Sequence, residues 1–415
     1  KYIFNYSLSS VDRKIKDEEL NVHICHYADV YKNEKISNKH ILNRGTCTEV
    51  ELENFKLKKG DILITKDSED PKDIGIPCLI ENDLIDAVCG YHIGILRTNE
   101  NLEREFYFRY IQSADVKDYF FCESNGITRF GLGKSSVENL KIPILSIKEQ
   151  KTISQYLDKN TSQIDSLIKK IEKKIKLLDE QKIAIVNQYI TKGLNPIVET
   201  KDSGIDCIGE IPKHWEVKPL KYIAEITLGK MLTPNKKEDM LYRPYLRSFN
   251  VQENHLNLED ISYMWFSRKE IEKFVLKQKD ILVNEGGEVG RPCILKNDIN
   301  ETGFQNSINR IRVQNGNPDY IYLVIYLCFK RRYYDSIVNR VSIPHLTKEK
   351  LENCLVLIPP LEEQSKIERE LNLKFEKISE IMKLEKKRIL CLKDYRQSLI
   401  SSVVTGKIRI TEDMI

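Results

Sequence analysis

The sequence contains no Cys-x-x-Cys pair, and its ten cysteines follow no regular spacing. Zinc sites and disulfide frameworks both depend on such spacing, so we expect reduced, buried cysteines and no metal site. The apolar runs, of which residues 321–329 form one of the longest, are too short to span a bilayer. No signal peptide opens the sequence. These absences predict a cytoplasmic protein without a membrane partner.

Catalytic signatures are also absent. The sequence lacks the Asn-Pro-Pro-aromatic and Asp-Pro-Pro-aromatic tetrapeptides of amino-methyltransferases, and it lacks a Pro-Asp followed closely by Glu-x-Lys of the nuclease type. Six residues separate Gly126 from Gly133-Lys134, whereas a phosphate-binding P-loop requires four. His23 and His26 lie in a strand-like stretch, where residues three apart face opposite sides, and this argues against a shared metal. We therefore expect no catalytic activity and no cofactor.

One long stretch of the chain occurs twice. The first copy covers residues 149–190 and the second covers residues 363–404, and the two align without a gap at a constant shift of 214 residues. The matching positions are Glu149/Glu363, Gln150/Gln364, Ile153/Ile367, Leu157/Leu371, Ile164/Ile378, Ile175/Ile389, Leu178/Leu392 and Thr191/Thr405. A match of this length indicates an internal duplication and argues against two unrelated surface helices.

Apolar residues recur at heptad spacing in both copies, which predicts one narrow apolar face on a long helix. A helix of roughly 60 Å, at 1.5 Å per residue, needs a partner for such a face. We expect the two helices to pair antiparallel as a coiled coil. The predicted pairing residues are Leu157, Ile164, Ile168, Ile171, Ile175, Leu178, Leu371, Ile378, Ile389, Leu392 and Leu399. Glu385 interrupts the apolar pattern of the second copy, so we expect looser pairing there.

Both helices carry start and stop signals. Ser146 lies three residues before Glu149, as in a capping box, and Pro359-Pro360 precedes the second copy. Gly193 and Gly406 follow the last helical residues, where a left-handed C-terminal residue is common.

The regions before the two helices are mixtures of short strands and loops, and they are diverged copies of each other. Lys1-Tyr2-Ile3 recurs as Lys221-Tyr222-Ile223, and Asp61-Ile62-Leu63 recurs as Asp280-Ile281-Leu282. The offset in residue number between the two copies falls from 220 to 214 along the chain. Small insertions in loops produce such a change. Such large units are duplicated domains and do not form a solenoid. The stretch from Gly209 to Trp215 introduces the second copy, so we expect a similar segment to be missing before Lys1.

Several short motifs lie in and around the two helices and in the connector between the copies. They are Ile147-Lys148-Glu149-Gln150, Leu157-Asp158, Ile164-Asp165-Ser166-Leu167-Ile168, Ile190-Thr191-Lys192-Gly193-Leu194-Asn195-Pro196, Asp202-Ser203-Gly204-Ile205, Gly209-Glu210-Ile211-Pro212-Lys213-His214-Trp215, Pro359-Pro360-Leu361-Glu362-Glu363-Gln364 and Val404-Thr405-Gly406-Lys407-Ile408. In these motifs the sequence resembles type I restriction-modification specificity subunits, and the resemblance covers nearly its whole length. Departures from the family pattern are the absent N-terminal segment and Glu385.

The resemblance implies an α+β protein with a pseudo-two-fold internal repeat, in which two target-recognition domains are separated by two long antiparallel helices. Each domain would read one half of an interrupted double-stranded DNA sequence. The helices would dock two modification (methyltransferase) subunits and, through them, restriction subunits. The expected segments are recognition domains at 1–146 and 210–358, helices at 147–193 and 359–406, a connector at 194–209 and a tail at 407–415.

Base contacts in a major groove call for Arg, Lys, Asn, Gln or small polar side chains on loops and strand ends, and phosphate contacts call for Lys and Arg. Net charge is only +4, so a basic footprint has to be local. The predicted DNA-binding residues are Lys66, Ser68, Tyr91, His92, Thr128, Arg129, Lys134, Ser135, Arg243, Arg247, Asn250, Glu285, Arg291, Gln305, Asn306, Ser342, His345 and Lys348. Thr128 and Ser342 occupy matching places in the two copies, as do the turns at Lys66 and Glu285. For any single residue, a solvated loop side chain remains the alternative.

Two further functions compete with this prediction. A coiled-coil scaffold whose modules bind protein would show no basic surface across its modules. A self-contained methyltransferase or nuclease would require the catalytic motifs that the sequence lacks. Trp215 is expected to be a packing anchor, because base flipping belongs to the enzyme that modifies the base.

Overall fold

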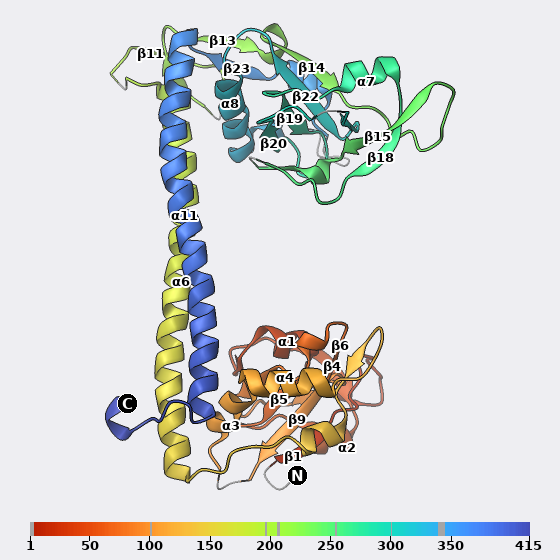
Figure 1. The fold of residues 1–415 in the computed structure, drawn as a ribbon, viewed down its shortest axis with the longest axis vertical. Coiled ribbons are helices and arrows are strands. Elements are labelled where there is room, and N and C mark those ends of the chain that lie inside the picture. The colour runs from red at the N-terminus through yellow and green to blue at the C-terminus, as the bar shows by residue number, and fades with distance from the viewer. Residues whose placement is uncertain are drawn as a thin grey trace. The chain divides into compact units, whose positions relative to one another are not determined.

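The computed structural model describes residues 4–99, 102–195, 197–205, 208–253, 255–299, 301–338 and 345–415. The chain divides into two compact units, each with its own sheets and core. The first unit comprises Lys1–Glu172 and Glu385–Ile415, and the second comprises Lys173–Leu384. Two long helices, α6 (Ile147–Lys192) and α11 (Leu361–Val404), contribute residues to both units (Figure 1).

The first unit is built on a five-stranded sheet and a three-stranded sheet. The five-stranded sheet has the order β1 (Phe4–Leu8), β9 (Ile93–Thr98), β5 (Ile62–Thr65), β7 (Pro77–Ile80), β3 (Lys35–Ile36). The three-stranded sheet has the order β4 (Asn43–Cys47), β2 (Leu20–Cys25), β8 (Ala87–Cys89), and β10 (Phe130–Gly131) pairs with β6 (Asp67–Ser68). The short helices are α1 (Tyr27–Lys32), α2 (Glu49–Phe55), α3 (Arg104–Ile111), α4 (Ala114–Glu123), α5 (Lys134–Glu138), η1 (Pro71–Asp73) and η4 (Glu412–Met414).

The second unit repeats this plan with a four-stranded sheet and a three-stranded sheet. Their orders are β14 (Ala224–Leu228), β22 (Ile308–Val313), β19 (Ile281–Asn284), β20 (Pro292–Ile294), and β18 (Ser262–Ser267), β15 (Met240–Leu246), β21 (Gly303–Phe304). Paired strands are β11 (Thr200–Asp202) with β12 (Glu210–Pro212), β13 (Glu216–Pro219) with β23 (Leu355–Ile358), and β16 (Val251–Gln252) with β17 (His255–Leu256). Its short helices are α7 (Arg268–Phe274), α8 (Pro318–Lys330), α9 (Tyr333–Ile337), α10 (Lys348–Glu352), η2 (Leu220–Tyr222) and η3 (Ser248–Asn250).

The internal repeat is visible in individual side-chain contacts. Gln150 bonds the carbonyl of Leu145, five residues earlier, and accepts from the backbone N–H of Glu103 before α3. Gln364 likewise bonds the carbonyl of Pro359 and accepts from the backbone N–H of Asn317 before α8. These matched contacts agree with the internal repeat, and the sheets and helices of both units confirm the predicted α+β fold.

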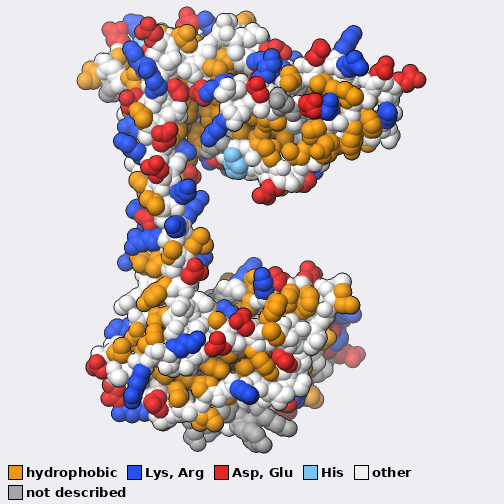
Figure 2. All heavy atoms as spheres, in the orientation of Figure 1, with side chains coloured by type: hydrophobic (Ala, Val, Ile, Leu, Met, Phe, Trp, Pro, Cys, Tyr) orange, Lys and Arg blue, Asp and Glu red, His pale blue; other side chains and the backbone are white. Residues whose placement is uncertain are grey.

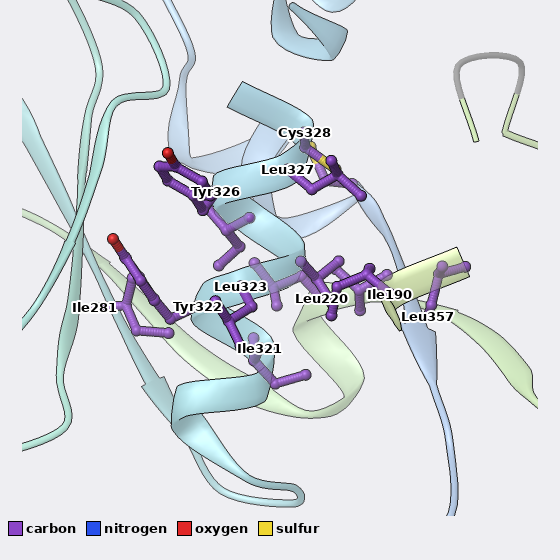
Figure 3. Close-up of a cluster of buried hydrophobic side chains, with 14 of the residues drawn as sticks. Ile190, Leu220, Ile281, Ile321, Tyr322, Leu323, Tyr326, Leu327, Cys328 and Leu357 are labelled. Atoms are coloured by element: carbon purple, nitrogen blue, oxygen red, sulfur yellow. The ribbon is translucent and has the colours of Figure 1, made fainter. Parts of the chain in front are cut away.

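The apolar helix α8 forms the centre of the second core. Tyr322 lies beside Ile281 of β19, whereas Leu323 lies beside Leu220, on the side that carries Ile190 of α6 (Figure 3). Every side chain from residue 320 to residue 328 is buried. Apolar side chains occur on every face of this helix because the sheet covers one side and α6 covers the other.

The two long helices pack on each other with opposite direction in both units. In the first unit, Leu157 and Ile164 from the first half of α6 share a core with Leu399 and Val403 near the end of α11. In the second unit, residues near the end of α6 share a core with residues at the start of α11, namely Val186, Ile190, Ile367 and Leu371. The predicted antiparallel arrangement of the helices is confirmed.

The predicted pairing residues differ in burial along the helices. Those with buried side chains are Leu157, Ile164, Ile168, Ile171, Leu371, Ile378 and Leu399, and those partly buried are Ile175, Leu178, Ile389 and Leu392. Glu385 is also buried, at 8% exposure, with Arg388 at 3.8 Å. A carboxylate in a buried position needs such a cation because desolvation disfavours its charge.

The predicted helix signals are confirmed. Ser146 and Glu149 form a capping box, in which the Glu149 N–H donates to Ser146 Oγ and the Ser146 N–H donates to the Glu149 carboxylate. Gly193 and Gly406 both adopt left-handed conformations, with φ of 67° and 76°. The described helices contain no segment long and apolar enough to cross a membrane.

Most of the described cysteines are buried, as predicted, but Cys122 and Cys391 are exposed. Cys122 lies in α4 and Cys391 lies in α11. Cys207 lies outside the described residues. In the described part of the chain, no group of three potential metal ligands comes together.

Candidate nucleic-acid interface

Each unit brings three loops together at one edge of its sheets, by the same backbone hydrogen bonds. In the first unit, the Lys66 N–H donates to the His92 carbonyl at 3.0 Å and the Leu132 N–H donates to the Lys66 carbonyl at 2.9 Å. In the second unit, the Glu285 N–H donates to the Ser307 carbonyl at 2.9 Å and the Leu346 N–H donates to the Glu285 carbonyl at 2.8 Å.

These bonds fix which loop residues correspond. Lys66 corresponds to Glu285, Asp67 to Gly286, and His92 to Ser307. The backbone is therefore shared while the side chains differ in charge and size. Thr128 precedes Leu132 on an exposed loop, but its predicted counterpart Ser342 lies outside the described residues.

The loops of the first unit meet around one carboxylate, that of Asp67. Arg129 Nη2 donates to Asp67 Oδ1 at 2.7 Å, and His92 Nδ1 lies 2.9 Å from the same oxygen. Lys66 Nζ lies 3.9 Å from the carboxylate and 4.6 Å from the ring centre of Tyr91. Four predicted residues thus gather around Asp67, which is not among the predicted DNA-binding residues.

A cavity of about 420 Å³ opens beside this cluster. His92, Tyr91 and Arg129 line it together with residues not predicted, which are Val11, Asp12, Arg13, His26, Tyr27 and Gly90. Burial, and then the charge of Arg13, lowers the pKa of His26. A cavity lined by arginines, histidines and tyrosines suits an electron-rich ligand with acceptor groups.

The remaining predicted residues of the first unit lie around this cluster. Ser68 accepts a hydrogen bond from the Tyr27 hydroxyl at 3.3 Å. Lys134 and Ser135 form the exposed first turn of α5, and Lys134 pairs with Glu138 at 3.9 Å. Only Gly133 separates them from Leu132, so they border the loops, and none of the described contacts joins them to Asp67.

In the second unit, the loop after β15 meets the turn after β19. Arg291 Nη2 donates to the Ser248 carbonyl at 3.3 Å, and the Ser248 N–H donates to Ser307 Oγ at 3.2 Å. Arg247 Nη2 donates to Asp260 Oδ2 at 2.8 Å. Arg291 Nη1 pairs with Glu288 at 2.6 Å. Arg247 and Arg291 are therefore held at the same edge of the unit, each near a carboxylate.

Other predicted residues complete this edge. Glu285 lies opposite His345, and burial raises the pKa of the Glu285 carboxyl although His345 opposes the shift. The turn of Gln305 and Asn306 is fixed by backbone bonds to Leu246 and Lys230. Lys348 begins α10 and pairs with Glu352 at 3.4 Å.

Two predicted residues stand apart from this edge. Asn250 is fully buried, and its amide donates to the carbonyls of Asn257 and Asp260 while accepting from the Arg247 N–H. All of these bonds hold its own loop. Arg243 lies in the middle of β15, opposite Met264, where its guanidinium pairs with Glu301.

An exposed aromatic surface on the second unit was not predicted. Tyr242 stacks on Tyr263 at 5.5 Å and contacts Trp265 at 5.0 Å, on the solvent face of β15 and β18. Figure 2 shows hydrophobic side chains gathered over these strands. The corresponding face of β2 and β4 carries His23 opposite Arg44. The alternating aromatic residues within 262–266 are the sequence feature from which this surface could have been predicted.

Comparisons with known proteins agree with this arrangement. A family model described as the type I restriction modification DNA specificity domain matches residues 13–177 and 212–393. A Methanocaldococcus jannaschii protein assigned as the MjaX specificity subunit of a type I restriction enzyme is 26% identical over 372 residues, covering 87% of this chain and 81% of its own length. The EcoKI specificity subunit of Escherichia coli is 21% identical over 364 residues, covering 86% of this chain and 76% of its own length.

A solved structure from a study of complex assembly and conformational transition in the type I restriction-modification system has the same fold. Its TM-score is 0.69 at 13% sequence identity, with 98% of each chain covered. The two matched segments of the family model each contain one of the loop clusters.

Proposed function

Because the chain belongs to the type I restriction modification DNA specificity family, we propose that it is the subunit that reads a two-part DNA sequence, one part with each unit. The observation that carries this proposal is the pair of loop clusters with one backbone framework and different side chains. Lys66, Asp67 and His92 in the first unit correspond to Glu285, Gly286 and Ser307 in the second. Two such clusters suit two half-sites of different sequence.

Affinity and specificity come from different residues in this proposal. Exposed cations near the loops, such as Lys134 and Lys348 with 59% and 45% of their side chains exposed, neutralise phosphates. That contribution is sequence-independent and falls with salt. Arg129, Arg247 and Arg291 lie at the loop edges, where base contacts discriminate.

We assign the recognition domains to residues 1–146 and 210–358, and the conserved helices to residues 147–193 and 359–406. The chain has no catalytic activity of its own and acts in the cytoplasm, where the DNA is. Two modification subunits dock on the helices and restriction subunits bind through them. Exposed apolar side chains along α6 and α11 support docking, and they are Leu177, Leu373, Leu384, Leu390 and Tyr395.

The proposal is tested by mixing the chain with its cognate methyltransferase subunit and enriching bound duplexes from a random DNA library at several salt concentrations. The expected result is a two-part motif with a constant gap, and affinity that falls steeply with salt. A complex that enriches no motif, or binds without salt dependence, contradicts the proposal and favours a protein-binding scaffold.

A further inference from the structure

The contact between Arg129 and Asp67 has a definite orientation. Arg129 donates through Nε at 3.1 Å and through Nη2 at 2.7 Å, both to Asp67 Oδ1. The Asp67 side chain is only 12% exposed, whereas that of Arg129 is 56% exposed. The carboxylate therefore lies on the buried side of the contact and the guanidinium on the exposed side, where Nη2 also lies 3.1 Å from His92 Nδ1.

Asp67 is itself held in place. It belongs to β6, which pairs with β10 so that Asp67 lies opposite Gly131 and Ser68 lies opposite Phe130. Arg129 precedes β10 directly. Strand pairing thus brings the aspartate and the arginine together although 62 residues separate them. His92 Nδ1, at 2.9 Å, approaches the carboxylate from a third loop.

The donors left over on Arg129 determine what it can bind. A guanidinium has five N–H donors in one plane. Asp67 takes the Nε donor and one Nη2 donor. Arg129 Nη2 also lies 3.1 Å from His92 Nδ1; with the ring proton on Nδ1, where it donates to Asp67, this contact takes no Arg129 donor, and one Nη2 donor and both Nη1 donors remain. Two of these point in parallel from the end of the side chain, and the two acceptors of guanine in the major groove, O6 and N7, match such a pair.

A phosphate also accepts paired donors from arginine, but the carboxylate favours a base as the ligand. Asp67 offsets part of the positive charge of Arg129, which weakens attraction to a phosphate. What the carboxylate adds is a fixed direction of the donors. Direction matters for a base edge, which is recognised by its pattern of acceptors, and matters less for a phosphate.

We propose that Arg129 reads a guanine in the half of the target that the first unit recognises, and that Asp67 is the residue that positions it. This inference rests on the proposed function and names one base of the half-site. The arrangement belongs to the first unit, because Gly286 replaces Asp67 and Ser307 replaces His92 in the second.

The test uses the complex of the full chain with its methyltransferase subunits and the duplex motif that this complex enriches. Each guanine in turn is replaced by 7-deazaguanine, which lacks the N7 acceptor. At one guanine of the first unit's half-site, binding should weaken on the order of 5- to 150-fold, the range for a bidentate base contact. The Arg129→Ala variant should bind the guanine and 7-deazaguanine duplexes equally.

The Asp67→Asn variant should reduce the preference for guanine over 7-deazaguanine at that position and leave the other half of the motif unchanged. Because the readout is a ratio for one protein preparation, partial loss of folded protein cannot mimic it. Asp260→Asn is the matched control, since Asp260 holds Arg247 in the second unit. It should leave the guanine preference intact.

Two results would overturn the inference. One is a half-site in which no guanine shows N7 dependence, and the other is an Arg129→Ala complex that keeps this dependence. Failure of the proposed function is distinguishable, because the complex would then enrich no two-part motif in the first place.

Discussion

Removal of the Glu34 carboxylate should destabilise the first unit strongly. Glu34 Oε1 accepts from Gln112 Nε2 at 2.7 Å and from Arg109, and its second oxygen accepts from Arg396 of α11. Arg109 is 3% exposed and also bonds Asp158 of α6 at 2.7 Å. Glu34 therefore joins the loop before β3 to α3 and to both long helices.

The expected cost follows from the hydrogen bonds that are lost. Arg109 and Arg396 keep Asp158 and Asp165 as partners, and the Glu34 side chain is 31% exposed, so the cost lies below that of breaking a fully buried ion pair. Glu34→Ala should lower the free energy of unfolding of the first unit by about 1.5–3 kcal/mol, the value of hydrogen bonds to charged groups. Glu34→Gln keeps an acceptor and loses the charge, and should cost less than Glu34→Ala.

Hydrogen exchange measures the effect separately in each unit. Amides of β5 and β9 report on the first unit, and amides of β19 and β22 report on the second. Glu253 is the matched control, because its carboxylate pairs with Lys330 at 2.6 Å in the second unit. Glu34→Ala should lower protection in β5 and β9, and Glu253→Ala should lower it in β19 and β22. A loss below about 1 kcal/mol for Glu34→Ala, typical of an exposed pair, would refute the reasoning.

Three further predictions concern pH, helix pairing and the burial of Trp215. Burial disfavours the charge of Glu34, but Arg109 and Arg396 outweigh it and lower its pKa below 4.5, so the stability that it confers is present above 4.5 and lost as pH falls through the lowered pKa. Acid titration followed by circular dichroism should show this loss of stability in the parent chain and a smaller loss in the Glu34→Gln chain. An equal loss in both chains would contradict the role of Glu34. Ile164→Glu should reduce the cooperativity of the thermal melt, because Ile164 is buried against α11, while Leu177→Glu at a 54% exposed position should leave it unchanged. Trp215→Ala should cost about 3–5 kcal/mol in urea unfolding, since Trp215 is fully buried and its Nε1 donates to Glu363 at 3.2 Å; a cost near zero would place Trp215 outside the core.

The long helices could be predicted because their signals are local. Heptad spacing, the capping box at Ser146 and the stop at Gly193 each depend on residues within a few turns. The duplication strengthened the prediction, because the same helix pattern appears in two aligned copies. Glu385 shows the limit of this reasoning: the heptad spacing places this position on the apolar face, where it is buried, but the spacing does not account for a carboxylate there.

The loop clusters were only partly predictable because they depend on contacts between distant residues. Lys66, His92 and Arg129 were selected by residue type, yet what joins them is Asp67, through a strand pairing across 62 residues. Asn250 shows the opposite case. An asparagine on a polar loop is a candidate for a base contact in the sequence, but the Asn250 amide donates its hydrogen bonds to the carbonyls of Asn257 and Asp260 in its own loop.

The most direct test of the central claim is to assign each half of the DNA motif to one unit. Complexes that carry Lys66→Ala with Arg129→Ala, or Arg247→Ala with Arg291→Ala, are compared with the parent complex on duplexes scrambled in one half at a time. We predict that the first pair of substitutions relaxes the sequence requirement in one half only and that the second pair relaxes it in the other half only. If either pair relaxes both halves equally, or neither, the two units do not read separate halves.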